Sequence, residues 1–380
     1  MLLPFKSILT TGLTLLLLLS VAVCYGQDRD KMVKTFEGYF QKELKSPAEY
    51  REKVNVVSKV FPDGNVLPYS LLAVGLCQRI YEKPGPLTKP RLPAVESAIE
   101  LLLAANPEKD LTKKHGMVYS HQAMALAAYR LAGGKRKDWE DYEAKLYPLL
   151  VELLEAKKGL PIDSFPDRVR PLDTTVALFA LTLRDRVAGT QVAPPLVKAH
   201  LEWLNGDGAD FETGLPCSEF FPDKKRATGA RGCDLSWRLA LWTEIDKKMA
   251  DQWYRMYRIA FWHDDKFLKG FCEWGGDREV KSDVESGPII NGVGCTATVL
   301  GPCVTRAFKD DQYDKIIIEQ AAKLAKARKS RNPVSKVLTA TVDKRLNEVG
   351  IPTDGQYITG SLYGDVMAFH ALSWHPFPKN

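Results

Sequence analysis

Two kinds of helical segment alternate along this chain, and their alternation limits the possible folds more than any other feature. One kind is amphipathic, with charged residues between apolar residues that recur every three or four positions, as in 138–157. The other kind is apolar on nearly all sides and rich in small residues, as in 172–186. Because a helix that is apolar all round must be buried on every side, we expect the amphipathic helices to cover the apolar ones.

Six segments of each kind predict a ring of helix pairs. The amphipathic segments are 32–46, 92–105, 138–157, 194–205, 246–262 and 311–330, and the apolar segments are 66–80, 117–132, 172–186, 233–245, 288–307 and 361–373. No pair can bury its own apolar face, so neighbouring pairs must stack. Strand signals are almost absent. We therefore expect an all-α fold, an (α/α)6 toroid with the apolar helices inside, as a single domain over residues 27–380.

Residues 1–26 are expected to be a signal peptide or an N-terminal membrane anchor. A lysine precedes an apolar run with five consecutive leucines, and the sequence turns polar after Gly26. This order is typical of a secretory signal peptide. The run is short for a spanning helix, so an uncleaved anchor formed by residues 8–23 is the alternative. We expect a periplasmic or secreted protein that meets a membrane only through this segment.

Charge and cysteine usage exclude several classes of protein. The net charge of +6 is mild and spread along the chain, which argues against a nucleic-acid-binding protein. One basic stretch, 323–345, carries eight Lys and Arg residues against Asp343 alone, and is expected to be a solvated connector. No Cys/His spacing resembles a zinc site, and no strand precedes the glycine-rich segment 288–307. We therefore expect no metal, no cofactor, and a small molecule as partner, with a homo-oligomer also possible.

Long connectors lead into the apolar helices, and polar residues stand where those helices begin. Loops gathered at one end of a scaffold often carry binding and chemistry. The polar residues at these helix starts are Tyr69, Tyr119, His121, Asp173, Cys233, Asp234, Asp283 and Glu285. If the ring closes, all of them can face one cavity.

The acidic residues among them have two interpretations. Asp173 and Asp234 fit the role of helix caps, which bond the free N–H groups of a first turn. Asp283 and Glu285 lie just before a Gly-Pro helix entrance, where they could be either helix caps or site residues. If paired across a cavity, these carboxylates would be the acid and base of a hydrolase or lyase that acts on a saccharide.

Four other residues carry possible chemistry. Cys217 and Cys233 flank a loop with lysines and arginines, and nearby cations and a helix N-terminus favour a thiolate at Cys233. A disulfide between the two is the alternative. His121 can act as an acid or base near neutral pH, or be a hydrogen-bonded core residue. Trp274 lies on a loop and is the best candidate for stacking on a ligand.

Several of these patches resemble one known family. Tyr119-Ser-His, followed by Ala128-Tyr-Arg-Leu-Ala-Gly-Gly, is similar to the corresponding helix of the linalool dehydratase/isomerase family. The two cysteines before a Trp-rich helix resemble its paired cysteines. The segments Gly270-Phe-Cys-Glu-Trp-Gly and Asp283-Val-Glu-Ser-Gly-Pro also resemble a group of uncharacterised exported bacterial toroid proteins. The resemblance covers patches within residues 115–300.

This resemblance implies an (α/α)6 fold, a periplasmic home and chemistry on a terpene alcohol without a cofactor. His121 matches the family's histidine, and Cys217 and Cys233 match its two cysteines, although the loop between them is longer here. The family's aspartate has no clear counterpart, with Asp63 as a candidate. Tyr69 is the candidate for one of its tyrosines.

We therefore predict an exported lyase or isomerase that acts on a small apolar alcohol. Dehydration of an allylic alcohol needs an acid, a base and a dry apolar pocket. A carbohydrate-active hydrolase or lyase and a non-catalytic helical binding scaffold are the two alternatives. A cavity lined by Leu, Met and aromatic residues, in which His and Cys alone are polar, would favour the first function. An open cleft with facing carboxylates and an exposed Trp274 would favour the second. A filled centre, or a disulfide between Cys217 and Cys233 away from any pocket, would favour the third.

Overall fold

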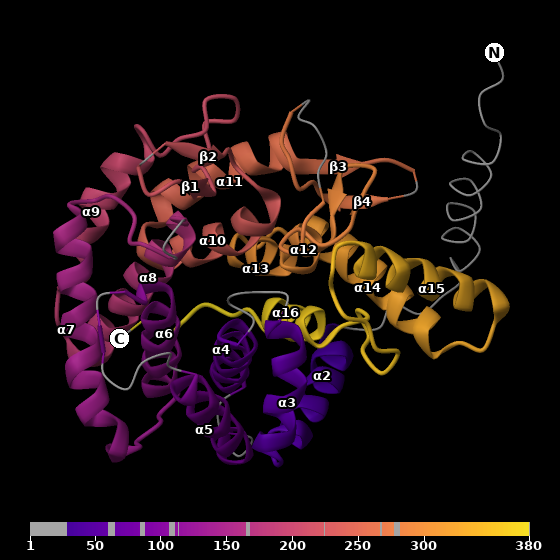
Figure 1. The fold of residues 1–380 in the computed structure, drawn as a ribbon, viewed down its shortest axis with the longest axis horizontal. Helices are drawn as coiled ribbons and strands as arrows, with labels where there is room; N and C mark the ends of the chain where they lie inside the picture. Colours follow the sequence, from indigo (N-terminus) through magenta and orange to yellow (C-terminus); the bar gives the residue numbers. More distant parts are fainter. Residues whose placement is uncertain are drawn as a thin grey trace.

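The chain folds almost entirely into helices (Figure 1). The computed structural model describes residues 29–59, 65–83, 88–105, 111–112, 114–164, 168–223, 225–266, 268–276 and 282–379. The prediction of an all-α fold is confirmed. The predicted signal segment and Asp63 lie outside the described residues. Within the described ranges, no helix is both long enough and apolar enough to cross a bilayer.

The inner helices contact one another in a closed circuit. They are α4 (Leu67–Glu82), α6 (Gly116–Leu131), α8 (Pro171–Ala188), α10 (Gly232–Ile245), α12 (Cys295–Val299), α13 (Gly301–Ala307) and α16 (Leu362–Leu372). In that order each helix packs on the next, and α16 packs back on α4. Their side chains are buried on nearly all sides, as the apolar composition requires.

The amphipathic helices each cover one inner helix. They are α2 (Arg29–Glu43), α5 (Thr88–Ala104), α7 (Glu140–Lys157, after a 3₁₀ turn at Lys137–Trp139), α9 (Ala193–Leu204), α11 (Lys247–Phe261) and α14 (Asp311–Lys329). Helix α11 shows why: Ala250, Trp253, Tyr257 and Phe261 are buried on one face, while Ile259 on the other face is exposed. Helix α2 covers α16, so the first and last helices of the described chain form the last pair (Figure 1).

The segment 288–307 is not the single helix that its composition predicted. It begins with a hairpin of β5 (Ile289–Ile290) and β6 (Val293–Gly294), whose turn residues Asn291 and Gly292 both have positive φ. Helix α12 then ends before Gly301-Pro302. Within a continuous helix, Pro302 would remove one backbone hydrogen bond, and its ring would clash with the carbonyl group four residues earlier. Helix α13 therefore starts as a new helix there.

Two helices and two further hairpins were not predicted. Helix α15 (Pro333–Glu348) lies in the basic stretch, so the prediction of a connector there is wrong, and α3 (Pro47–Ser58) follows α2. Pro333 suits a first helical turn, and the Asn332 side chain accepts a hydrogen bond from the Val334 N–H at 2.9 Å. Antiparallel hairpins pair β1 (Glu219–Phe220) with β2 (Arg226–Thr228) and β3 (Trp262–Asp264) with β4 (Lys269–Phe271).

Gly232 allows α10 to begin directly against the segment that carries Cys272 and Glu273. Its N–H donates to the Glu273 carbonyl at 2.8 Å, and a Cβ at this position would overlap the Cys272 carbonyl oxygen. We expect Gly232→Ala to lower the free energy of unfolding by about 2 kcal/mol or more, measured by urea denaturation. Gly38→Ala in α2 is the control, because nothing lies near its Cβ and alanine should stabilise the helix by roughly 0.5–1 kcal/mol. Equal stability of the Gly232 variant and the wild type would contradict this close approach.

Candidate functional site

A cavity of about 100 Å³ lies where the first turns of the inner helices meet. One part of its wall is apolar and consists of Leu67, Leu71, Met117, Leu172, Trp237, Leu300 and Met367. The other part is polar and consists of His121, Arg170, Asp173, Ser218, Glu219, Arg231, Cys233, Asp234, Glu285, Thr296 and Tyr363. The cavity therefore combines an apolar wall with several groups that can exchange protons.

Five of the residues singled out from the sequence line this cavity. They are His121, Asp173, Cys233, Asp234 and Glu285. Asp173, Cys233 and Asp234 stand in the first turns of α8 and α10, and His121 stands in the second turn of α6. Glu285 lies on the loop that precedes the β5–β6 hairpin. The structure thus brings together a histidine, a thiol and three carboxyl groups.

Three other predicted residues lie away from the cavity wall. Tyr69 is buried with its ring against that of Tyr50, at a centroid distance of 5.9 Å. The Tyr119 hydroxyl accepts a hydrogen bond from the Thr112 N–H at 2.9 Å. Cys217 is buried in a small cluster with Val169 and Phe220. Their positions fit packing roles.

Asp283 and Trp274 contact the site indirectly, through Arg231. Both Asp283 oxygens accept hydrogen bonds from Arg231 Nη2, at 2.9 and 2.8 Å. The Arg231 guanidinium carbon lies 5.0 Å from the centre of the Trp274 ring. Trp274 therefore stacks on an arginine of the protein, and Asp283 holds that arginine from outside the cavity.

His121 is a buried, neutral imidazole. Burial lowers its pKa to about 3, and the nearby His370 acts in the same direction. Its Nδ1 lies 2.7 Å from Ser70 Oγ, and its ring packs at 5.7 Å from that of Trp237. In the tautomer in which Nδ1 donates to Ser70, the serine hydroxyl donates on to the Leu67 carbonyl at 3.4 Å. Nε2 is then an acceptor available to a molecule in the cavity.

Asp173 and Asp234 are buried carboxyl groups with raised pKa values. Burial raises the pKa of Asp173 to about 6, against the lowering effect of Arg170 and Ser164. Burial also raises the pKa of Asp234, although its Oδ2 accepts from Ser218 Oγ at 2.6 Å and pairs with Arg238 at 2.7 Å.

Each of these two carboxyls keeps one oxygen unused. Asp173 Oδ2 and Asp234 Oδ1 are buried and accept no hydrogen bond from any described residue. Neither side chain caps the helix that carries it, so the cap interpretation does not account for them. Buried oxygens without a hydrogen-bond partner are rare because they cost free energy, and both of these belong to residues that line the cavity.

Arg231 links the acidic residues on the polar side of the cavity. Its Nε donates to Glu273 Oε1 at 2.7 Å, and its Nη1 donates to Glu285 Oε2 at 3.1 Å. Arg170 pairs with the other oxygen of Glu285, and Asp283 binds Arg231 as described above. Each of these pairings fixes a carboxylate in place, so this part of the wall is held rigidly.

Cys233 is a neutral thiol, which corrects the expectation of a thiolate. Its Sγ donates to Glu273 Oε1 at 3.0 Å, and its N–H donates to Glu273 Oε2 at 3.1 Å. Burial raises the thiol pKa and outweighs the lowering effect of Arg231, while Glu273 raises it further. In the described part of the chain Cys233 and Cys217 are thiols that form no disulfide with each other.

Glu273 was not identified from the sequence as a site residue. It is completely buried, and burial raises its pKa to about 6. Its position between Cys272 and Trp274 placed it in a segment that was singled out for the tryptophan. A charged residue between two residue types that favour burial was the signal that could have identified it.

The raised pKa of Cys233 predicts slow alkylation. At pH 7.5 we expect iodoacetamide to modify Cys233 about tenfold or more slowly than it modifies glutathione, because the thiolate is the reactive form. Peptide mass spectrometry over a time course measures the rate. Glu273→Gln should speed the reaction by removing a neighbouring negative charge, and Glu219→Gln is the matched control, because Glu219 pairs with Arg168 instead. Modification as fast as that of glutathione would show that the thiol is ionised.

Metal ligation has no obvious place here. Among the residues that the structure describes, no group of three or more His, Cys, Asp and Glu side chains is arranged to hold a metal ion. Glu273, Asp283 and Glu285 do converge, but the guanidinium group of Arg231 lies between them.

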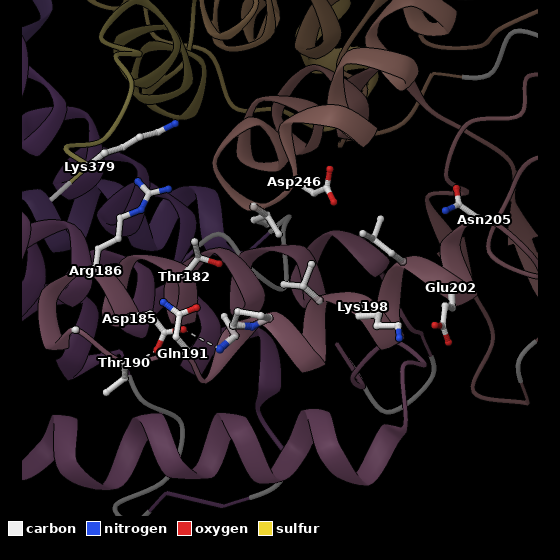
Figure 2. Close-up of a pocket in the computed structure, with 16 residues that line it drawn as sticks. Thr182, Asp185, Arg186, Thr190, Gln191, Lys198, Glu202, Asn205, Asp246 and Lys379 are labelled. Atoms are coloured by element: carbon white, nitrogen blue, oxygen red, sulfur yellow. Dashed lines mark hydrogen bonds between the residues drawn. The ribbon is translucent and has the colours of Figure 1, made fainter.

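A wider hollow of about 820 Å³ lies on the outside, between α8, α9 and the end of α10 (Figure 2). Two of its charged groups, Asp185 and Arg186, are engaged in holding the fold. Asp185 accepts hydrogen bonds from Thr190 Oγ1 and from the N–H groups of Val192 and Ala193 at the start of α9. Arg186 pairs with Glu244 at 2.8 Å. None of the predicted site residues lines this hollow, so we place the candidate site in the smaller central cavity.

Comparison with known proteins gives no family for this chain. No protein-family model matches the sequence, and no curated protein matches it.

Proposed function

We propose that this chain is a cofactor-independent acid–base enzyme of the lyase or isomerase type that acts on a small alcohol with an apolar body. One observation carries the proposal. A single cavity holds a neutral imidazole, His121, and two buried carboxyls with raised pKa values, Asp173 and Asp234, beside an apolar wall.

The reaction divides between these groups. The protonated Asp173 carboxyl donates its proton to the substrate hydroxyl, and the C–O bond breaks to release water. His121 Nε2 removes a proton from the neighbouring carbon, and the C–H electron pair forms the double bond. When the product leaves, His121 releases its proton to solvent and Asp173 takes one up, so both groups return to their starting states. Isomerisation follows if the water adds back at another carbon.

The apolar wall has a part in this chemistry. Leu71, Met117, Trp237 and Met367 exclude water from the carbon atoms of the substrate. The attraction between a positively charged, carbocation-like centre and the fixed carboxylates beside it is stronger in a dry surrounding, because the dielectric constant is low there. The Cys233 thiol lines the same space, with its S–H donated to Glu273.

The proposal includes the fold and the location of the protein. We propose that the inner helices and their covering helices form an (α/α)6 toroid, a single domain over residues 27–380, supported by the closed circuit of helix contacts. The similarity of the residues around His121 to the linalool dehydratase/isomerase family supports the reaction class. The apolar run before Gly26 supports a periplasmic or secreted location, with or without an anchor.

A second function has one observation in its favour. Asp173 and Asp234 both line the cavity, and each has an oxygen without a hydrogen-bond partner among the described residues. A carbohydrate-active hydrolase or lyase would use such a pair. Stacking of Trp274 on Arg231 weighs against this function, because the predicted sugar platform is occupied. A non-catalytic scaffold is less favoured, since the centre holds a cavity with chemically competent groups.

Parallel substrate panels distinguish these functions. The purified full chain is incubated with small allylic and tertiary alcohols, and separately with oligosaccharides. We expect alkene or rearranged alcohol by gas chromatography, lost in Asp173→Asn and in His121→Asn but retained in Tyr119→Phe, which changes a hydroxyl outside the cavity. Release of reducing ends that depends on Asp173 and Asp234, without turnover of alcohols, would establish the second function instead. No turnover in either panel would favour the scaffold.

A further inference from the structure

Helices α14 and α15 carry a cluster of cations that the proposed reaction does not use. We call this cluster the basic face, and its exposed members are Lys323, Lys326, Lys329, Arg331 and Lys336. No ion pair joins any of them to a described residue. The other cations nearby have acidic partners: Arg328 pairs with Asp343, and Lys344 and Arg345 share Glu348. The basic face therefore presents an uncompensated positive charge to solvent.

Two apolar side chains lie exposed beside these charges. Val334 and Val337 are 36% and 52% exposed, and they lie three residues apart on α15. Residues at this spacing share one side of a helix. Exposed valines beside a cationic surface can enter a lipid headgroup region, where apolar burial adds to electrostatic attraction.

The position of α15 leaves this side accessible. Helix α15 packs mainly on α14, outside the circuit of inner and covering helices. Figure 1 shows the two helices side by side at the edge of the molecule, on the opposite side from α7 and α9. A flat surface can therefore approach α15 without obstructing the central cavity.

We propose that the basic face docks the protein on an anionic phospholipid surface. The positive charge is complementary to anionic headgroups, and such attraction falls off within a Debye length. Val334 and Val337 would enter the headgroup region. The chain before Arg29 contains the apolar run that is expected to direct it to a membrane, which places such a surface within reach. A nucleic acid would use the cations but would leave the valines without a role, and the mild overall charge does not favour it.

Vesicle binding by the full chain tests the proposal. The probe is a vesicle of phosphatidylcholine, with or without phosphatidylglycerol. The variant replaces Lys326, Lys329, Arg331 and Lys336 with Gln, and the matched control replaces Lys34, Lys145, Lys198 and Lys248, exposed cations on other helices, with Gln. Both variants carry the same net charge and the same N-terminal segment, so a difference between them isolates the basic face.

We expect binding to phosphatidylglycerol vesicles to weaken about tenfold or more in the basic-face variant, to change little in the control, and to decrease with added salt. A fluorophore attached through Val337→Cys should report an apolar environment on these vesicles, and one attached through Ile259→Cys on α11 should not. Three results would overturn the proposal: equal binding to both vesicle types, equal weakening in both variants, or binding of a DNA or RNA oligonucleotide at a salt concentration at which vesicles do not bind.

Discussion

Replacement of Asp173 by Asn is expected to abolish turnover and to raise stability at alkaline pH. Asn cannot donate the proton that the hydroxyl leaving group needs, and loss of a positioned acid or base costs about 10²–10⁴-fold in rate. The measurement is the rate of product formation with the best substrate of the panel. Loss of activity together with higher stability would show that the effect is chemical and not a failure to fold.

The direction of the stability effect follows from the pKa of Asp173. The folded-state pKa, about 6, is above the ordinary value of 3.8. As pH rises between these values the unfolded chain releases its proton first, so the folded state loses stability and stays less stable above pH 6. Asn carries no charge, so urea denaturation at pH 8 should show a gain of roughly 1–3 kcal/mol, and little gain at pH 4.

Asp185→Asn is the control variant, in which the free energy of unfolding is expected to fall and not to rise. Asp185 is also buried, but both of its oxygens accept hydrogen bonds that hold the start of α9. Replacing an acceptor oxygen with an NH₂ group should therefore cost about 1–3 kcal/mol. A loss of stability in both variants would mean that Asp173 is a structural residue.

Replacement of Arg231 by Met is expected to have the largest effect on stability. The side chain is almost fully buried and is the ion-pair partner of Glu273, which is 0% exposed. Removing one partner of a buried pair leaves an uncompensated charge and costs about 3–5 kcal/mol. Chemical denaturation at pH 7.5 measures the loss.

A double-mutant cycle identifies the cause of that loss. Glu273→Gln in the Arg231→Met background should recover about half or more of the lost stability, because the stranded charge is removed. Arg258→Met is the matched control: its side chain is 41% exposed and its guanidinium pairs with Asp310, so its loss should cost less than about 1 kcal/mol. Equal costs for the two arginines would contradict the assignment of Arg231 as the centre of the site.

Sequence periodicity predicted the long helices well and the short elements poorly. Helices such as α8 and α11 follow from apolar spacing, because burial of one face or of all faces depends on local composition. The β5–β6 hairpin was missed although Asn291-Gly292 is a strong hairpin signal, because its two-residue strands were assigned to a longer apolar helix. Helix α15 was missed because its polar, basic composition lacks an apolar stripe wide enough to indicate a buried face.

Helix geometry also explains which predicted site residues line the cavity. Tyr119 and His121 are two residues apart, and a rotation of about 100° per residue places them on opposite sides of α6. Leu67 and Leu71, four residues apart, both line the cavity, so Tyr69 between them faces away. Stricter use of this rule would have separated the tyrosines from the histidine.

The sequence by itself determined the helical class, the order of covering and inner helices, and the end of the helices at which chemistry-bearing residues gather, because these depend on spacing along the chain. Only the tertiary structure decided that Arg231 meets Glu273, Asp283 and Glu285, and that Cys233 keeps its proton. Ion pairs and pKa values depend on burial and on distances between segments that are far apart in sequence. No local pattern encodes those distances.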